Sequence, residues 1–165
     1  MVRYHKYMLW GLGLLLGLAG PVFGELRLGV QADLDKFSES RSPVQVDGGF
    51  GLSLRLSRPG MFEDKLEVRE GNRQVTVLEG GRFTELLSLE WGPARYWIIG
   101  EYSGGAHCCG QYHFLAQSGP QSPVKYLGNS LGHNGGPLSL KQALRPHQGQ
   151  LYFQDLDNRF DYFHE

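Results

Sequence analysis

The residues most able to do chemistry lie in the stretch Ser103–Cys109, which reads Ser-Gly-Gly-Ala-His-Cys-Cys. Its two cysteines, Cys108 and Cys109, are adjacent. A trans peptide holds neighbouring Cα atoms about 3.8 Å apart, which is below the usual disulfide range of roughly 4.4–6.8 Å. A bond between the two sulfurs would therefore close a strained ring that is easier to reduce than an ordinary structural disulfide.

Three interpretations of this stretch remain open. The first is a Cys108–Cys109 disulfide that rigidifies a turn, which an oxidising compartment would favour. The second is a copper or zinc site formed by His107, one or both thiolates and His113, with His133 as a further candidate ligand, since sulfur and imidazole suit both metals. The third is a redox or catalytic thiol whose pKa a neighbouring histidine lowers. The spacing matches neither a Cys-x-x-Cys motif nor an established zinc-finger pattern.

Aromatic and imidazole side chains flank the cysteines. Tyr102 precedes the stretch, and Tyr112 and His113 follow it. The sequence contains no P-loop or dinucleotide fingerprint. This pattern favours a non-enzymatic loop that binds a ligand or partner through the His-Cys-Cys residues and these neighbours. His113, between two aromatic residues of a predicted strand, is more typical of a hydrogen-bonded sheet residue than of a metal ligand.

A second polar cluster lies near the C-terminus. Asp155, Asp157 and Asp161 supply carboxylate oxygens of the kind that calcium prefers. The spacing lacks the glycine and the terminal glutamate of an EF-hand loop. Turns in which aspartate side chains bond to their own backbone explain the same residues with fewer assumptions. Calcium is therefore the weaker of the metal predictions.

The first 24 residues have the order of a secretory signal peptide. Arg3 and Lys6 precede an apolar stretch, Met8–Leu18, and small and turn-forming residues follow it up to Gly24. We expect cleavage before Glu25, export to the periplasm or the extracellular space, and no membrane span in the mature protein. A retained membrane anchor is the alternative, and it is disfavoured by the glycines and the proline that interrupt the apolar stretch.

The charge balance argues against nucleic acid and anionic lipid as binding partners. Removal of the leader would leave 14 Lys and Arg residues against 17 Asp and Glu residues, a formal net charge of −3. A chain without a basic excess lacks the attraction on which binding to nucleic acid and to anionic lipid depends. We therefore expect a ligand or protein of the cell envelope as the partner, and no nucleic acid.

Alternating apolar residues between glycine-rich turns predict an all-β protein. Leucine occupies every second position near the end of the segment 50–56, so in a strand these leucines would share one face. The segments 65–70 and 73–78 also alternate, and the Gly-Asn pair between them suits a tight hairpin turn. The run 95–102 is too continuously apolar for an edge strand, so we expect it at the centre of a sheet.

These patterns predict an antiparallel β-sheet or sandwich held together by one packed core, because adjacent cysteines cannot staple distant parts of the chain. The chain divides into a signal peptide over 1–24, a flexible or loop-rich segment over 25–47 with several serines and acidic residues, and a single β domain over 48–165. Within that domain, the segment 138–144 fits either a strand or a single helical turn.

The stretch Glu101–Cys109 and the late stretch Asp157–Phe163 together resemble a group of uncharacterised exported bacterial proteins. Its members pair Ser-Gly-Gly-Ala-His-Cys-Cys with a late Asp-x-Arg-Phe-x-Tyr-Phe. Related members also carry Asp-x-Asp-Gly loops like those of calcium-binding propeller blades, whereas this chain has Glu90–Pro93 at the matching place. The resemblance implies propeller-blade-like hairpins and an exported location, and it implies no particular activity.

Overall fold

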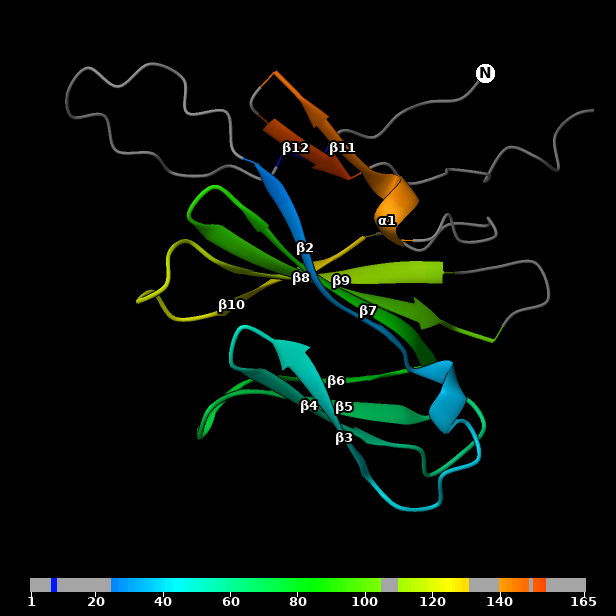
Figure 1. Ribbon diagram of the computed structural model, residues 1–165. Helices are drawn as coiled ribbons and strands as arrows, with labels where there is room; N and C mark the ends of the chain where they lie inside the picture. The colour runs from blue at the N-terminus through cyan, green and yellow to red at the C-terminus, as the bar shows by residue number, and fades with distance from the viewer. Residues whose placement is uncertain (1–6, 9–24, 105–109, 131–139, 149, 154–165) are drawn as a thin grey trace, which may run out of the picture.

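The computed structural model describes residues 7–8, 25–104, 110–130, 140–148 and 150–153. These residues form three antiparallel sheets that stack in layers (Figure 1), and the all-β prediction is confirmed. The stacking of the sheets resembles that of a β-sandwich. No helix within these ranges has the length and apolar character of a membrane span.

The middle layer is a five-stranded sheet in the order β10-β9-β8-β7-β2. Its strands are β2 (Leu26–Asp33), β7 (Arg82–Trp91), β8 (Ala94–Tyr102), β9 (Gly110–Gln117) and β10 (Lys125–Asn129). β8 is the central strand, as the apolar run 95–102 predicts. Its residues from Tyr96 to Glu101 are all buried, because both faces of this sheet are covered by other layers.

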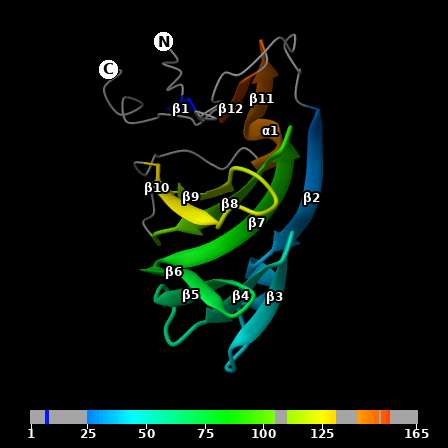
Figure 2. The ribbon, with the colours of Figure 1, turned by 90° about the vertical axis from the view of Figure 1, so that its left-hand side faces the viewer.

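The second layer is a four-stranded meander whose strands follow one another along the chain. The strands are β3 (Val44–Gly49), β4 (Leu52–Ser57), β5 (Asp64–Glu70) and β6 (Arg73–Gly80). The predicted β5–β6 hairpin is confirmed, with Gly71 at a φ of 55° that glycine adopts without strain. β2 and β3 lie along one side of this sandwich, and β10 and β6 lie along the other (Figure 2).

The third layer covers the opposite face of the five-stranded sheet (Figure 1). In this small sheet β12 (Gln150–Phe153) pairs with both β1 (Tyr7–Met8) and β11 (Leu144–His147). The helix α1 (Leu140–Ala143) leads directly into β11. The described part of the segment 138–144 therefore contains a helical turn followed by the first residue of a strand.

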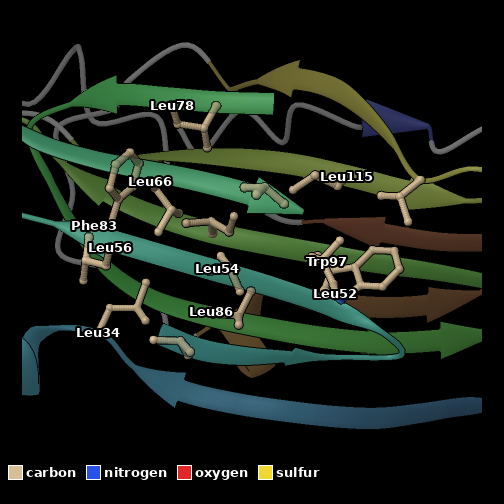
Figure 3. Packing of buried hydrophobic residues seen from close by; sticks show 14 residues of the cluster. Leu34, Leu52, Leu54, Leu56, Leu66, Leu78, Phe83, Leu86, Trp97 and Leu115 are labelled. Atoms are coloured by element: carbon tan, nitrogen blue, oxygen red, sulfur yellow. The ribbon is translucent and has the colours of Figure 1, made fainter. Parts of the chain in front are cut away.

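Two hydrophobic cores lie on the two faces of the five-stranded sheet. The inner core, between the five-stranded and four-stranded sheets, includes the leucines of β4 together with Phe83 and Trp97 (Figure 3). The outer core lies under α1 and the small sheet. Side chains of β8 alternate between the two cores, so Trp97 and Ile99 face the inner core while Tyr96 and Ile98 face the outer core.

The segment 25–47 contains two strands, and its interpretation as flexible or loop-rich is wrong at both ends. β2 pairs with β7, and β3 pairs with β4. Between the strands, the short 3₁₀ turn η1 (Asp35–Phe37) follows Leu34, whose side chain is fully buried. The serines and acidic residues of this segment drew attention away from apolar residues at every second position. In β3, for example, Val44 and Val46 pack into the inner core.

Candidate functional site

The structure describes three of the predicted site residues. Tyr102 ends β8, and Tyr112 and His113 lie in β9. Tyr102 pairs in register with Gly110, so the stretch 103–109 joins two neighbouring strands. The other predicted residues lie outside the described ranges: they are His107, Cys108 and Cys109 of the vicinal-cysteine stretch, and Asp155, Asp157 and Asp161 of the C-terminal cluster. The disulfide, copper, zinc and calcium predictions for these residues stay predictions.

Tyr112 and His113 point to opposite faces of β9, as successive strand residues must. Tyr112 is buried in the outer core, where its ring meets that of Phe153 edge-on with ring centroids 4.9 Å apart. The backbone amide of Tyr112 donates to Oγ of Ser130 at 2.9 Å. Tyr112 therefore packs between the middle and outer layers, whereas His113 faces the inner core.

Tyr102 lies beside the exposed Phe62, and Met61, which precedes Phe62 in the chain, is exposed as well; we call these three residues the aromatic patch. The exposed fractions are 78% for Met61, 37% for Phe62 and 38% for Tyr102. Phe62 lies in the turn between β4 and β5, and its ring meets the Tyr102 ring edge-on with centroids 6.1 Å apart. Gly104 packs so closely on the Phe62 ring that a Cβ there would lie 2.9 Å from Cγ of Phe62. Two sheets thus contribute to one surface patch.

Next to Tyr102, Glu101 and His113 form a buried hydrogen-bonded pair. Nε2 of His113 lies 2.6 Å from Oε2 of Glu101, and the two side chains are 7% and 4% exposed respectively. On the other side of the imidazole, Nδ1 lies 2.9 Å from the hydroxyl of Tyr126 in β10. The ring of Phe83 meets the imidazole edge-on. Three neighbouring strands therefore carry a continuous Glu101–His113–Tyr126 chain of hydrogen bonds.

Strand alternation explains why these polar side chains are buried. Glu101 follows Trp97 and Ile99 at two-residue intervals, so it points toward the inner core. A buried carboxylate is costly unless its oxygens accept hydrogen bonds. Besides His113, the Glu101 carboxylate accepts the amide of Gly81 at 2.6 Å on Oε1 and Nε2 of Gln111 at 2.5 Å on Oε2. Both oxygens are therefore satisfied.

The hydrogen bonds also determine where the protons lie. An ionised carboxylate only accepts, so Nε2 of His113 carries a hydrogen. While the imidazole is neutral, Nδ1 then accepts from the hydroxyl of Tyr126. Both ring nitrogens are engaged, and neither is left for a metal in this arrangement. Among the residues that the structure describes, no group of three or more His, Cys, Asp or Glu side chains could hold a metal ion.

The surroundings shift two pKa values in this chain of hydrogen bonds. Burial alone would raise the pKa of Glu101, but the hydrogen bonds from His113, Gly81 and Gln111 together outweigh burial and lower it. Burial raises the pKa of Tyr126, and the negative charge of Glu101 raises it further. At neutral pH, the carboxylate is therefore ionised and the phenol keeps its proton.

The lowered pKa of Glu101 predicts an acid-labile contribution to stability. A carboxyl whose pKa is lower in the folded state stabilises the fold fully above its unfolded value, about 4.3, and this stabilisation is lost as pH falls through the folded value. We expect the difference in unfolding free energy between wild type and Glu101→Gln to shrink as urea titrations move from neutral pH to below about pH 4. A difference that stayed constant across this range would contradict the prediction.

Gly81 lies where the chain passes from the four-stranded to the five-stranded sheet. Its amide donates to Glu101, and its carbonyl accepts the amide of Asp64 at 3.0 Å. Asp64 begins β5, two residues after Phe62. Gly81 also lies against the backbone of Tyr102, where a Cβ would be 2.2 Å from the Tyr102 carbonyl oxygen. Gly81 therefore links the two parts of the aromatic patch.

Asp64 also belongs to a buried polar cluster that holds the turn between β4 and β5. Its Oδ2 accepts the amide of Phe83 at 2.9 Å and lies 3.4 Å from Nη1 of Arg58. The Arg58 side chain is buried, and Nη2 donates to the carbonyls of Leu34 and Phe83, each at 2.9 Å. Burial raises the pKa of Asp64 despite the opposing hydrogen bond from Phe83 and the charge of Arg58. Buried polar contacts therefore tie the turn that carries Phe62 to β7.

Comparison with protein-family models, with curated proteins and with solved structures finds no match for this chain. The candidate site therefore rests on its geometry. Sequence reasoning missed Met61 and Phe62, which follow a Pro-Gly turn, and the roles of Glu101 and Tyr126. The available signal was the position of Glu101, a charged residue at a core-facing place in an otherwise apolar strand.

Proposed function

We propose that this protein is an exported, non-enzymatic β-sandwich module that binds a ligand or protein of the cell envelope. Binding would use the aromatic patch and the adjoining stretch Ser103–Cys109. The observation that carries the proposal is the joint exposure of Met61, Phe62 and Tyr102. Scattered exposed apolar residues are normal, whereas a contiguous group is typical of interaction surfaces.

The hydrogen bonds that hold the aromatic patch in place also favour a binding role. Phe62 and Tyr102 belong to segments of different sheets, and Gly81 forms hydrogen bonds with both segments. Aromatic side chains supply much of the energy at protein interfaces, and a surface that is ordered before binding loses less conformational entropy. The order of residues in the first 24 positions supports export.

The alternative is a copper, zinc or thiol redox protein that uses His107, Cys108 and Cys109. Such a site would require ligands other than His113, because both ring nitrogens of His113 already have hydrogen-bond partners. The intact mass of the exported protein, before and after reduction and alkylation, separates the two functions. Thiols that alkylate only after reduction support the binding module with a vicinal disulfide, and freely reactive or metal-loaded thiols support the alternative.

Site-specific photo-crosslinking tests the binding role. p-Benzoylphenylalanine is placed at position 62 or 102 in cells that export the protein, and the matched control position is Leu127, which is 52% exposed on β10. We expect one defined adduct from each patch position and none from position 127. Phe62→Ser should reduce the adduct formed from position 102 on the order of tenfold, because aromatic anchors dominate interfaces. Equal adducts from all three positions, or none from the patch, would overturn the proposal.

A further inference from the structure

We propose that Tyr126 is an electron-donor site for one-electron oxidants, with His113 as the acceptor of its phenol proton. This role goes beyond the proposed binding function and does not depend on it. It rests on the Glu101–His113–Tyr126 chain, in which the phenol, the imidazole and the carboxylate already share hydrogen bonds of 2.9 and 2.6 Å.

The Glu101 carboxylate orients the His113 imidazole so that it can accept the proton of the Tyr126 phenol. Glu101 holds the hydrogen of Nε2, so a neutral His113 presents the lone pair of Nδ1 to the Tyr126 hydroxyl. After proton transfer, the imidazolium would lie 2.6 Å from a carboxylate that also accepts from Gly81 and Gln111. A fixed negative charge stabilises the positive charge as it forms, as in other carboxylate–histidine pairs.

The step balances in electrons and protons. The oxidant takes one electron from the Tyr126 ring, the O–H bond of the phenol breaks, and the proton forms a new bond to Nδ1 of His113. The products are a neutral phenoxyl radical, an imidazolium paired with the Glu101 carboxylate, and the oxidant reduced by one electron. Return of an electron to the ring returns the proton to the phenol.

The placement of Tyr126 favours electron transfer over nucleophilic catalysis. A nucleophilic phenol must meet its substrate at the oxygen, but this oxygen is directed at His113, which is only 6% exposed. The ring of Tyr126 is only partly buried, on an edge strand, so an oxidant can approach the ring without reaching the oxygen. Tyr152 offers a contrast, because its hydroxyl donates to the amide oxygen of Gln150, which is not a base.

Stopped-flow oxidation by hexachloroiridate(IV), with the tyrosyl radical identified by electron paramagnetic resonance, tests this assignment. We expect a fast phase in wild type that Tyr126→Phe abolishes and the matched variant Tyr152→Phe retains. His113→Gln should slow that phase on the order of 10²-fold, which is typical of removing a positioned general base. Glu101→Gln should slow it less, because the imidazole remains.

Two outcomes would overturn the proposal. The first is a fast phase that persists in Tyr126→Phe. The second is an unchanged fast phase in His113→Gln, because the proton would then leave by another route. If His113→Gln does not fold, the effect of buffer on wild type replaces it: transfer to His113 predicts a fast phase whose rate does not change with buffer concentration at constant pH. A rate that rises with buffer concentration would show transfer to a base in solution and contradict the role of His113.

Discussion

Replacement of Glu101 by alanine is expected to lower the free energy of unfolding by about 3 kcal/mol, because three hydrogen-bond donors lose their acceptor. The variant leaves the amide of Gly81, Nε2 of Gln111 and Nε2 of His113 without their acceptor in the protein interior. A buried donor without a partner costs about 1–3 kcal/mol. Equilibrium urea unfolding at neutral pH measures the loss.

Two further variants test whether the loss of stability is due to the hydrogen bonds of Glu101. Glu101→Gln keeps the shape and one acceptor oxygen of the side chain, so we expect it to lose less stability than Glu101→Ala. Glu67→Ala removes a glutamate from β5 whose partner Arg55 is half exposed, and such pairs contribute about 0–1 kcal/mol. If Glu101→Ala lost no more stability than Glu67→Ala, the hydrogen bonds of the Glu101 carboxylate would not be stabilising the fold.

Substitution of Gly81 by alanine is expected to cost about 3 kcal/mol, at the upper end of typical overpacking effects. The added Cβ would lie 2.2 Å from the carbonyl oxygen of Tyr102 and 2.6 Å from Cα of Ser103. These are backbone atoms and cannot rotate away, so the backbone between β6 and β7 must move. The same urea titration measures the loss, and the crosslink formed from position 102 should weaken in parallel because Gly81 holds that strand end.

The matched control for Gly81→Ala is Gly119→Ala. A Cβ at Gly119 would meet only the Ser122 hydroxyl, at an ordinary 3.9 Å, and we expect a change within about 0.5 kcal/mol. Equal stabilities for the two alanine variants would show that the backbone at Gly81 can shift without loss of stability.

The sequence predicts the strands well where apolar residues alternate locally. The leucines of β4 and the two arms of the β5–β6 hairpin show a clear two-residue period, and in β4 and β5 this period also decides which side chains are buried. The continuous apolar run of β8 identifies the centre of the sheet, because only a strand covered on both faces lacks polar alternation. β2 carries the same two-residue period, with Leu26, Leu28, Val30 and Ala32 at alternate positions, so the sequence offered a strand signal there that the prediction of a loop-rich segment overlooked.

The candidate site is harder to predict because it depends on register between strands. Glu101 and His113 are 12 residues apart, and Gly81 precedes Glu101 by 20. Local patterns give each residue a face, but they do not say which residues of neighbouring strands lie opposite one another. Proximity in sequence suggested that Tyr112 and His113 share a surface with Tyr102. Strand alternation instead directs Tyr112 and His113 into different cores.

The layout of the sheets has a consequence for the order of folding. The strands of the meander β3–β6 each pair with their neighbours in the chain, so they close only short loops. β2 must instead find β7, and the contact between Val30 and Ser88 spans 58 residues. Closing a long loop costs more chain entropy and slows folding. The meander β3–β6 and the run β7–β10, whose strands also pair in chain order, are therefore favoured to form before β2 joins the edge of the middle sheet.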